Sequence, residues 1–179
     1  LRVISIYSEI FSNFFEKRHV SFETYEELLE KFKAEHYLYI NSFEENMIKH
    51  KNISNLIIYN FERLQDKWLQ ENSTKFTKNF NREEKLFEIF RLQLDKMKPD
   101  VLFFQHSAPF DLLRLKNLKE DFPFIKKIIF HNGIPIKDSN LKYVDYIFSA
   151  VPYLANFYKS QSINSSLLYH YFDKEILKK

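Results

Sequence analysis

The sequence predicts an α/β domain of Rossmann-like, three-layer architecture, in which helices cover both faces of a mostly parallel sheet of about five strands. Its apolar runs are short and continuous, as in Val101–Phe104, which is typical of strands buried on both faces. Helical patterns or long connections separate these runs, and this order favours parallel strands joined by right-handed crossovers. A length of 179 residues suits one domain of this kind.

Helical signals dominate the amino-terminal part of the chain. Apolar side chains over 25–32 recur with the spacing of one helix face, and Thr24–Glu27 has the form of a capping box at its start. Ser42–Glu45 repeats that form, and an earlier helix is expected over 4–17. We therefore expect 1–52 to be a helical segment packed on the same domain, without a strand of its own.

Residues 53–179 carry the pattern expected of the Rossmann-like sheet. Helices are predicted behind Asn60, behind the capping box Asn81–Glu84, near Pro109–Glu120 and from Pro152, a residue type that favours the first helical turn. Each apolar run that alternates with these helices is interpreted as a parallel strand. The predicted strands are Leu56–Tyr59, Asp100–Gln105, Lys127–His131, Tyr146–Ser149 and Leu167–His170.

Composition excludes several classes of function. The chain has no cysteine, so disulfides and thiolate metal sites are excluded, and no metal site is expected from the histidine spacing. Its single glycine, Gly133, rules out the glycine-rich phosphate loops. The 27 basic and 24 acidic residues form no clustered positive face, so nucleic acid is not an expected partner. No apolar run is long enough to span a membrane.

Polar residues follow the predicted strands where each strand ends. In open parallel sheets, ligands bind outside the carboxyl ends of the strands. Three of the six histidines occur at such ends, which predicts a crevice for a polar ligand. The candidate ligand-binding residues are Asn60, Gln105, His106, Ser107, His131, Asn132, Gly133 and His170, and Ser149 occupies an equivalent position.

A structural interpretation of these residues stays open beside the functional one. A polar side chain at a strand end often satisfies a helix N-terminus or a loop carbonyl, and this interpretation is favoured for His106. Gly133 indicates either a turn with positive φ or a ligand that passes close to the backbone. Asp100 and Asp145 precede strands and are expected to cap loops, while Trp68 is expected to anchor the core.

Five motifs in consistent order resemble those of a group of bacterial GT-B glycosyltransferases of the spore-maturation type. The first, over 60–68, has the form N-x-x-x-L-Q-x-x-W, and Lys98–Leu102 is similar to the KPDVL entry to a strand. A strand with a following glycine over 125–133 is the third motif. The pattern over 145–152 and the HYFDKEIL segment over 170–177 complete the series. The resemblance covers residues 21–177.

The resemblance implies the acceptor-binding half of a glycosyltransferase, which moves a sugar from a nucleotide-sugar donor to an unidentified acceptor. GT-B enzymes have two Rossmann-like halves, and the carboxyl-terminal half, absent from this chain, would bind the donor, so no cofactor is expected here. In an inverting enzyme, His106 or His131 would be the general base, because an imidazole has a suitable pKa. In a retaining enzyme, they would instead hydrogen-bond acceptor or sugar hydroxyls.

A second hypothesis is a non-catalytic Rossmann-like module that binds a ligand or docks a partner. The reading frame beyond residue 179 separates the two hypotheses, because a further Rossmann-like domain there would favour the enzyme. In both cases the isolated chain is expected to be inactive as a transferase. An uncovered cleft face is expected to permit self-association. Nucleotide sugars and the lack of cysteine both favour a cytoplasmic location.

Overall fold

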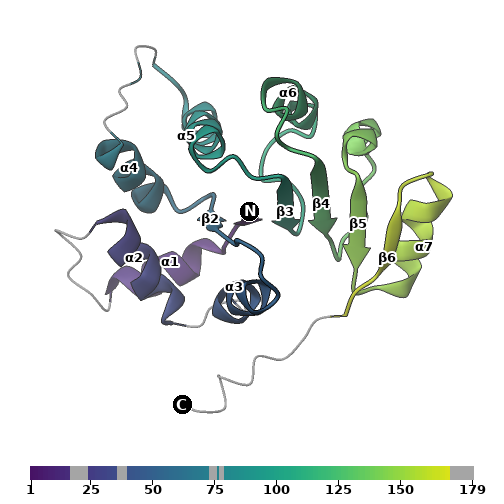
Figure 1. The fold of residues 1–179 in the computed structure, drawn as a ribbon, viewed down its shortest axis with the longest axis horizontal. Coiled ribbons are helices and arrows are strands. Elements are labelled where there is room, and N and C mark those ends of the chain that lie inside the picture. Colours follow the sequence, from purple (N-terminus) through teal and green to yellow (C-terminus); the bar gives the residue numbers. More distant parts are fainter. Residues whose placement is uncertain (17–23, 36–39, 73–75, 77–78, 170–179) are drawn as a thin grey trace.

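The computed structural model describes residues 1–16, 24–35, 40–72, 76 and 79–169, and β-strands alternate with helices along this length (Figure 1). The elements in chain order are β1 (Arg2–Ile4), α1 (Ser8–Glu16), α2 (Tyr25–Lys33), α3 (Ile40–Lys49), β2 (Leu56–Ile58), α4 (Glu62–Glu71), α5 (Arg82–Met97), β3 (Val101–Gln105), α6 (Arg114–Asp121), β4 (Lys127–His131), the 3-10 helix η2 (Ser139–Tyr143), β5 (Tyr146–Ser149), α7 (Pro152–Ser160) and β6 (Ser165–Leu167).

All six strands are parallel and form one sheet in the order β2-β1-β3-β4-β5-β6. This confirms the predicted α/β, Rossmann-like fold class. From β1 the chain adds a strand on one side to form β2, and then returns past β1 to add β3 and the later strands on the other side. The switch point of the topology therefore lies between β1 and β3, which is where open parallel sheets bind ligands.

The sixth strand is β1, in the segment where no strand was expected. The predicted helix over 4–17 begins only at Ser8, and Arg2–Ile4 lies between β2 and β3 instead. Val3 is paired with Ile57 on one side and with Phe104 on the other. Three residues are too few to show a strand period, so tertiary pairing with the strands on either side decides their conformation.

Three further predicted boundaries need correction. Residues Ser165–Leu167 form β6, in place of the predicted Leu167–His170, and His170 lies outside the described residues. The helix expected near Pro109–Glu120 begins at Arg114, and Ser42–Glu45 is not a cap because α3 already begins at Ile40. Ser165 is buried, and its hydroxyl donates to the Ala155 carbonyl of α7, a tertiary contact that no local pattern reveals.

Other local predictions are confirmed. Thr24 and Asn81 each form a capping box with the glutamate three residues later, so α2 and α5 begin where the sequence indicates. Pro152 is the first residue of α7. Trp68 is buried with 7% of its surface exposed, as expected of a core anchor. The Asp145 carboxylate, expected to cap a loop, instead accepts from the Ile128 amide of the neighbouring strand β4 at 2.7 Å.

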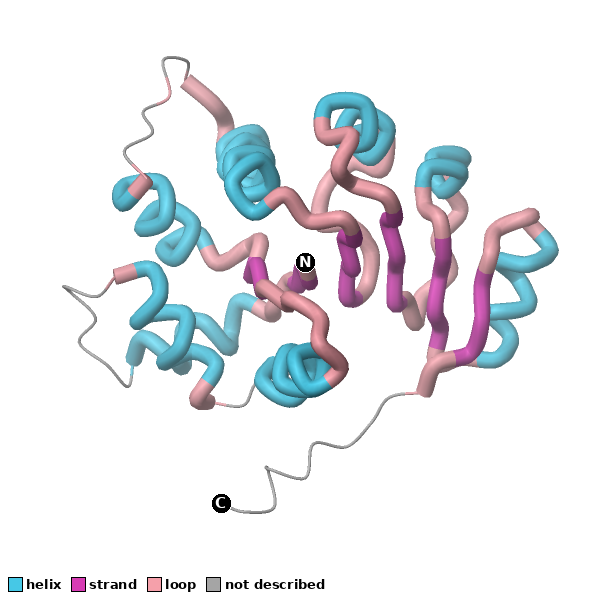
Figure 2. Tube along the Cα trace, in the orientation of Figure 1, coloured by secondary structure: helices cyan, strands magenta, loops and turns pink. Residues whose placement is uncertain are grey.

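Side chains alternate between two cores, one on each face of the sheet. Val3 and Ile57 belong to the larger core, which α5, α6 and α7 cover. Ile4 and Ile58, the next residues along the same strands, belong to a smaller core with α1, α2 and α4. Figure 2 shows the strands running between these two groups of helices. Helices on both faces were predicted, and the alternation confirms them.

Helix α3 is attached to the sheet through a buried ion pair. The guanidinium of Arg2 on β1, whose side chain is 1% exposed, lies 3.2 Å from the Glu44 carboxylate. Phe43 stacks on Phe103 of β3, with ring centroids 5.3 Å apart. These contacts hold α3 against β1 and β3. Within the described ranges, no helix is both long enough and apolar enough to cross a membrane.

Candidate functional site

His106 and His131 are neighbours at the carboxyl edge of the sheet. Gln105 and His131 are register partners at the ends of β3 and β4. The next residue, His106, donates its backbone N–H to the His131 carbonyl at 2.7 Å. The parallel pairing of two adjacent strands therefore brings together the two residues that the sequence singled out as candidate bases.

His106 has a backbone conformation that most residues avoid. Its φ is +84°, in the left-handed region, where a side chain costs conformational energy. Its side chain is exposed at the end of the central strand β3, and Ser107 beside it is exposed too. A strained, exposed histidine at the rim of a parallel sheet is typical of functional sites, where such strain is retained because the residue is needed there.

The ring of His131 has a defined tautomer. Its Nε2 lies 3.2 Å from the carbonyl oxygen of Leu168, in the segment after β6. Because a carbonyl oxygen only accepts hydrogen bonds, Nε2 carries the proton, and Nδ1 is the basic nitrogen of the neutral ring. The ring is half-buried between β4 and this segment. The hydrogen bond therefore fixes which nitrogen would take up a proton.

Gln105 serves the structure instead of the crevice. Its Oε1 accepts from Nε of Arg2 at 3.0 Å and also from Nη2 of the same guanidinium. The side chain thus points to the face that α3 covers, where it completes the network of Arg2 and Glu44. Gln105 does lie at a strand end, as predicted. Its side chain, however, points to the sheet face covered by α3 and not into a crevice at the end of the strand.

Asn132 and Ser149 also form internal hydrogen bonds. Asn132 is 4% exposed, and its Nδ2 donates to the Tyr158 hydroxyl at 2.9 Å and to the Ile134 carbonyl. Its backbone N–H donates to the Phe148 carbonyl. The buried Ser149 hydroxyl accepts from the Val151 amide at 3.1 Å, just before α7. For both residues the structural interpretation applies.

Gly133 does not have the positive φ that a turn was expected to impose. It is exposed, and a Cβ built on it would meet no atom within 4 Å. The turn interpretation of this glycine is therefore wrong, and neither backbone conformation nor a close approach of the chain requires it. It lies two residues after His131, on the same edge of the sheet.

Asn60 joins the ends of β1 and β2. Its Oδ1 accepts from the Ile6 amide at 2.9 Å, and its Nδ2 donates to the Ile6 carbonyl at 2.7 Å. The residue before α4 is Phe61, so Asn60 is not the N-cap that the sequence indicated. These paired bonds hold the two loops together at the switch-point side of the sheet.

A cavity of about 580 Å³ opens at this same place. It lies beyond the carboxyl ends of β1, β2 and β3 and beside the first turns of α5. Such a volume is ordinary for a small-molecule site. Of the predicted residues, Asn60 lines it. The full lining is Ser5, Tyr59, Asn60, Asn81, Arg82, Glu83, Leu86 and Pro109.

The sequence pattern does not reveal most of this lining. Ser5 follows a strand that was not recognised, so its place at the carboxyl edge was not visible. Asn81 and Glu83 were visible only as part of a helix start. The order of the strands in the sheet determines which strand ends lie beside the start of α5. That order is a tertiary property, which a local sequence pattern does not show.

The charges around the cavity are balanced. Glu83 lies 3.9 Å from Arg114 of α6, and Arg82 lies 2.5 Å from Glu62 of α4. Burial is the main cause that raises the pKa of Tyr59, which therefore keeps its phenolic proton at neutral pH. Its neighbour Glu83 raises this pKa further, while Arg114 opposes the change.

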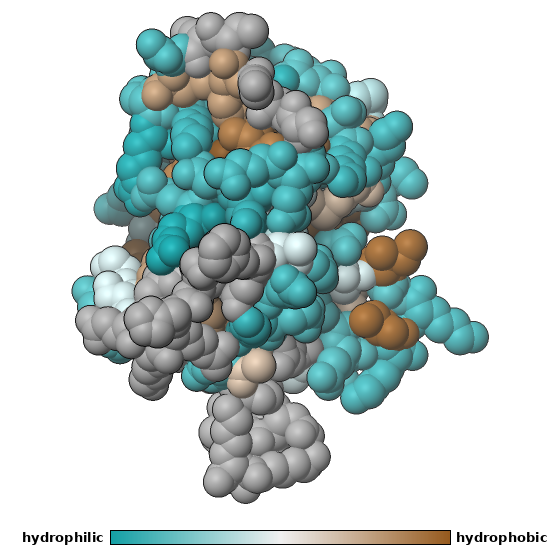
Figure 3. Space-filling model, turned by 90° about the vertical axis from the view of Figure 1, so that its left-hand side faces the viewer, coloured by the Kyte–Doolittle hydropathy of each residue, from teal (hydrophilic) through white to brown (hydrophobic). Residues whose placement is uncertain are grey.

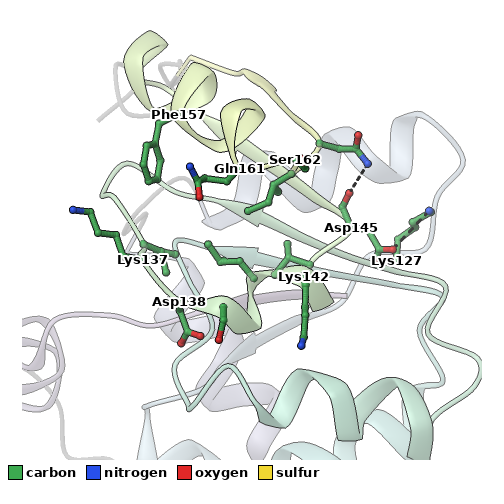
Figure 4. Close-up of a pocket in the computed structure, with 14 residues that line it drawn as sticks. Lys127, Lys137, Asp138, Lys142, Asp145, Phe157, Gln161 and Ser162 are labelled. Atoms are coloured by element: carbon green, nitrogen blue, oxygen red, sulfur yellow. Dashed lines mark hydrogen bonds and ion pairs between the residues drawn. The ribbon is translucent and has the colours of Figure 1, made fainter.

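A larger cavity, of about 910 Å³, lies at the opposite edge of the sheet (Figure 4). It is bordered by the start of β4, by η2 and by the end of α7. Lys127 and Lys119 contact the Asp145 carboxylate there, at 3.8 Å and 2.7 Å. Lys137 and Lys142 extend from the rim. This cavity lies at the amino ends of the strands, away from the histidines.

The face shown in Figure 3 is mainly hydrophilic, with hydrophobic side chains in small separate areas. Among the described residues there is no group of three histidine or carboxylate side chains that would suit a metal ion. The carboxyl edge is the part of the molecule where a cavity lies near the polar residues that the sequence singled out.

Comparison of the chain with protein-family models, with curated protein sequences and with solved structures found no match. The fold class and the candidate site are therefore inferred from the structure of this chain alone.

Proposed function

We propose that this domain is the acceptor-binding half of a glycosyltransferase that takes its sugar from a nucleotide-sugar donor. The proposal keeps the motif resemblance as its starting point. The observation that carries it is the pair His106 and His131 at the carboxyl edge of neighbouring parallel strands, one of them strained and exposed. A parallel sheet without glycine-rich loops suits a domain that leaves the donor phosphates to another domain.

In this proposal one imidazole takes the proton from an acceptor hydroxyl. The acceptor oxygen then attacks the anomeric carbon of the donor sugar, and the nucleoside diphosphate leaves with the electron pair of the broken bond. Nδ1 of His131 is the basic atom of that ring, because Nε2 donates to Leu168. His106, more exposed, contacts the acceptor beside it.

The test uses the protein encoded by the whole reading frame that contains these residues. Sugar transfer from UDP-glucose, UDP-N-acetylglucosamine and GDP-mannose is measured against a mixture of simple glycosides. His106→Ala and His131→Ala are compared with His50→Ala, an exposed histidine after α3. Loss of the base is expected to lower kcat at least a hundredfold, by the usual contribution of about 10²–10⁴ for proton transfer. The His50 variant is expected to retain full activity.

Unchanged turnover in both variants would remove the histidines from the site. The isolated 179-residue chain is expected to show no transfer, and detectable transfer by it would contradict the half-enzyme proposal. A second candidate, a non-catalytic binding module, is favoured by one observation: Gln105, Asn132 and Ser149 all serve internal hydrogen bonds. A reading frame that ends at residue 179, with no transfer by its product, would support that candidate.

A further inference from the structure

The left-handed backbone of His106 needs contacts that hold it in place. Its φ of +84° is costly for a residue with a β-carbon, and such a conformation persists only where the surrounding structure fixes the chain. The residue is exposed, so burial of its ring supplies little of this energy. The contacts of the residues before and after His106 therefore maintain the strain.

Before His106, the side chain of Gln105 is bound to a buried cation. Its Oε1 accepts from Nε of Arg2 at 3.0 Å and also from Nη2 of the same guanidinium. Arg2 is 1% exposed, its Nη1 lies 3.2 Å from the Glu44 carboxylate, and its guanidinium lies 4.6 Å from the centroid of the Phe43 ring. The planar fork of N–H groups is thus fixed by β1 and by α3 together. Moving Gln105 away would leave buried donors unpaired, which is costly.

After His106, the chain enters the larger core within a few residues. Ala108 and Phe110 are 8% and 7% exposed and belong to that core, on the sheet face opposite to the Arg2 side chain. Between these two anchors, the His106 N–H donates to the His131 carbonyl at 2.7 Å. The chain therefore passes from one face of the sheet to the other while the amide of His106 stays bound to the neighbouring strand. His106 is the residue at which this change of direction occurs.

We infer that Arg2 is a positioning residue for the candidate site: through Gln105 it fixes the end of β3 and so keeps His106 in its left-handed conformation beside His131. Glu44 of α3 contributes by fixing the guanidinium. The inference rests on the proposed function only for the role that the imidazole plays. The hold of Arg2 on the backbone of His106 is a property of the chain itself and needs neither a donor nor an acceptor.

The first test measures the backbone of His106 by NMR in the 179-residue chain. A positive φ brings the amide and α protons of a residue closer together than an extended backbone does, so the parent is expected to show a strong nuclear Overhauser effect between these two protons. Gln105→Leu cannot accept from Arg2 and is expected to reduce this signal to that of an extended residue such as Phe103. Gln105→Glu keeps the acceptor oxygen and is expected to retain the signal.

Ser149→Ala is the matched control for this measurement. It also removes a hydrogen-bonding side chain from a strand end, that of β5, but the Ser149 hydroxyl accepts from Val151 and does not contact Arg2. The His106 signal is expected to stay unchanged, which separates the hold of Arg2 from a general loosening of the sheet. Where Gln105→Leu does not fold, Gln105→Asn, whose side chain is one methylene shorter, takes its place.

Chemical denaturation gives a second measurement. His106→Gly relieves the strain and is expected to raise the folding equilibrium constant of the parent chain about fivefold. In a Gln105→Leu background the strain has already been relieved, so the same substitution is expected to change this constant by less than about twofold. In the Ser149→Ala background the full gain is expected to remain.

Sugar transfer is measured separately, in the protein encoded by the whole reading frame. Gln105→Leu is expected to lower kcat/KM about tenfold, the factor for one lost hydrogen bond from His106 to the acceptor, and Gln105→Glu is expected to restore it. A chain in which Gln105 controls the His106 backbone, but which belongs to a protein that never transfers sugar, would keep this inference and lose the proposed function.

Four results would overturn the inference. The His106 signal survives in Gln105→Leu, the Ser149→Ala control loses it too, His106→Gly gains equally in the parent and in Gln105→Leu, or an active transferase is unaffected by Gln105→Leu.

Discussion

His106 illustrates at the scale of one residue how strain marks the candidate site. Its left-handed backbone is a conformation that glycine adopts freely and that a residue with a β-carbon adopts at a cost in energy, whereas Gly133 does not have a positive φ. At position 106 the chain adopts a left-handed conformation that would suit glycine, but the residue there is a histidine. We attribute the presence of histidine at this position to a functional role of its imidazole.

Substitution of His106 is expected to have opposite effects on stability and activity. His106→Gly is expected to raise the free energy of unfolding by about 1 kcal/mol, because the strain of the left-handed conformation is relieved. His106→Ala keeps the β-carbon and is expected to gain no such stability. Urea unfolding of the two variants measures the difference, and under the proposed function both variants are expected to abolish sugar transfer by the protein encoded by the whole reading frame. Equal stability of the glycine and alanine variants would contradict the presence of strain at this position.

At the scale of one element, the position of α3 depends on the buried pair of Arg2 and Glu44. Burial is the main cause that raises the pKa of Glu44, and the nearby guanidinium of Arg2 acts against it. The pair lies in the interior, with side-chain exposures of 1% and 9%, so each charge depends on the other. Breaking a buried pair leaves one charge uncompensated, which costs more than replacing both.

A double-mutant cycle tests this dependence. Glu44→Leu alone is expected to lower the free energy of unfolding by about 3–5 kcal/mol, because it removes the Glu44 carboxylate that lies 3.2 Å from the buried Arg2 guanidinium. Arg2→Met combined with Glu44→Leu is expected to cost much less than Glu44→Leu alone. Chemical denaturation of both single variants and the double variant gives the coupling energy. A double variant as unstable as Glu44→Leu would show that the ion pair does not set the stability of this element.

At the scale of the whole molecule, apolar side chains are exposed beyond the carboxyl ends of the last three strands. Ile134 follows β4, Tyr153 follows β5 and Leu168 follows β6, and their exposures are 71%, 72% and 44%. On the sheet itself, Ile129 and Phe148 belong to neither core and are half-buried. This edge and face consequently offer a surface that a second domain or a second copy would cover.

We predict that the isolated chain self-associates through this edge as its concentration rises. Ile134→Lys with Tyr153→Lys is expected to reduce the association, because two charges would have to be buried in the contact. Ile53→Lys is the matched control, since Ile53 is 91% exposed in the loop before β2, at the other end of that strand. Sedimentation velocity at several concentrations measures the effect. An equal loss of association in the control would place the contact elsewhere.

Most of the sheet was predictable because its strands are continuous apolar runs bordered by polar residues. The strands from β2 to β5 lie within one or two residues of their predicted positions. The adjacency of His106 and His131 follows from the parallel pairing that those runs imply. Strand β1 was not predictable, because it is three residues long and begins with an arginine whose buried guanidinium is bound by Glu44 of α3 and by Gln105, both distant in sequence.

Local pattern alone thus establishes that this chain is an α/β domain with polar residues at one rim of a parallel sheet. It does so because a strand that is buried on both faces is a continuous run of apolar residues, which is visible in the sequence. The three-dimensional arrangement decides which of those polar residues face a ligand. Arg2 binds the Gln105 side chain and Tyr158 binds that of Asn132, whereas Asn60 is hydrogen-bonded to Ile6 and still lines the cavity. These contacts join residues 26 to 103 positions apart. Hydrogen bonds over such separations have no periodic signature, so only the folded chain shows that the two histidines remain at the rim and that a cavity forms beside Tyr59.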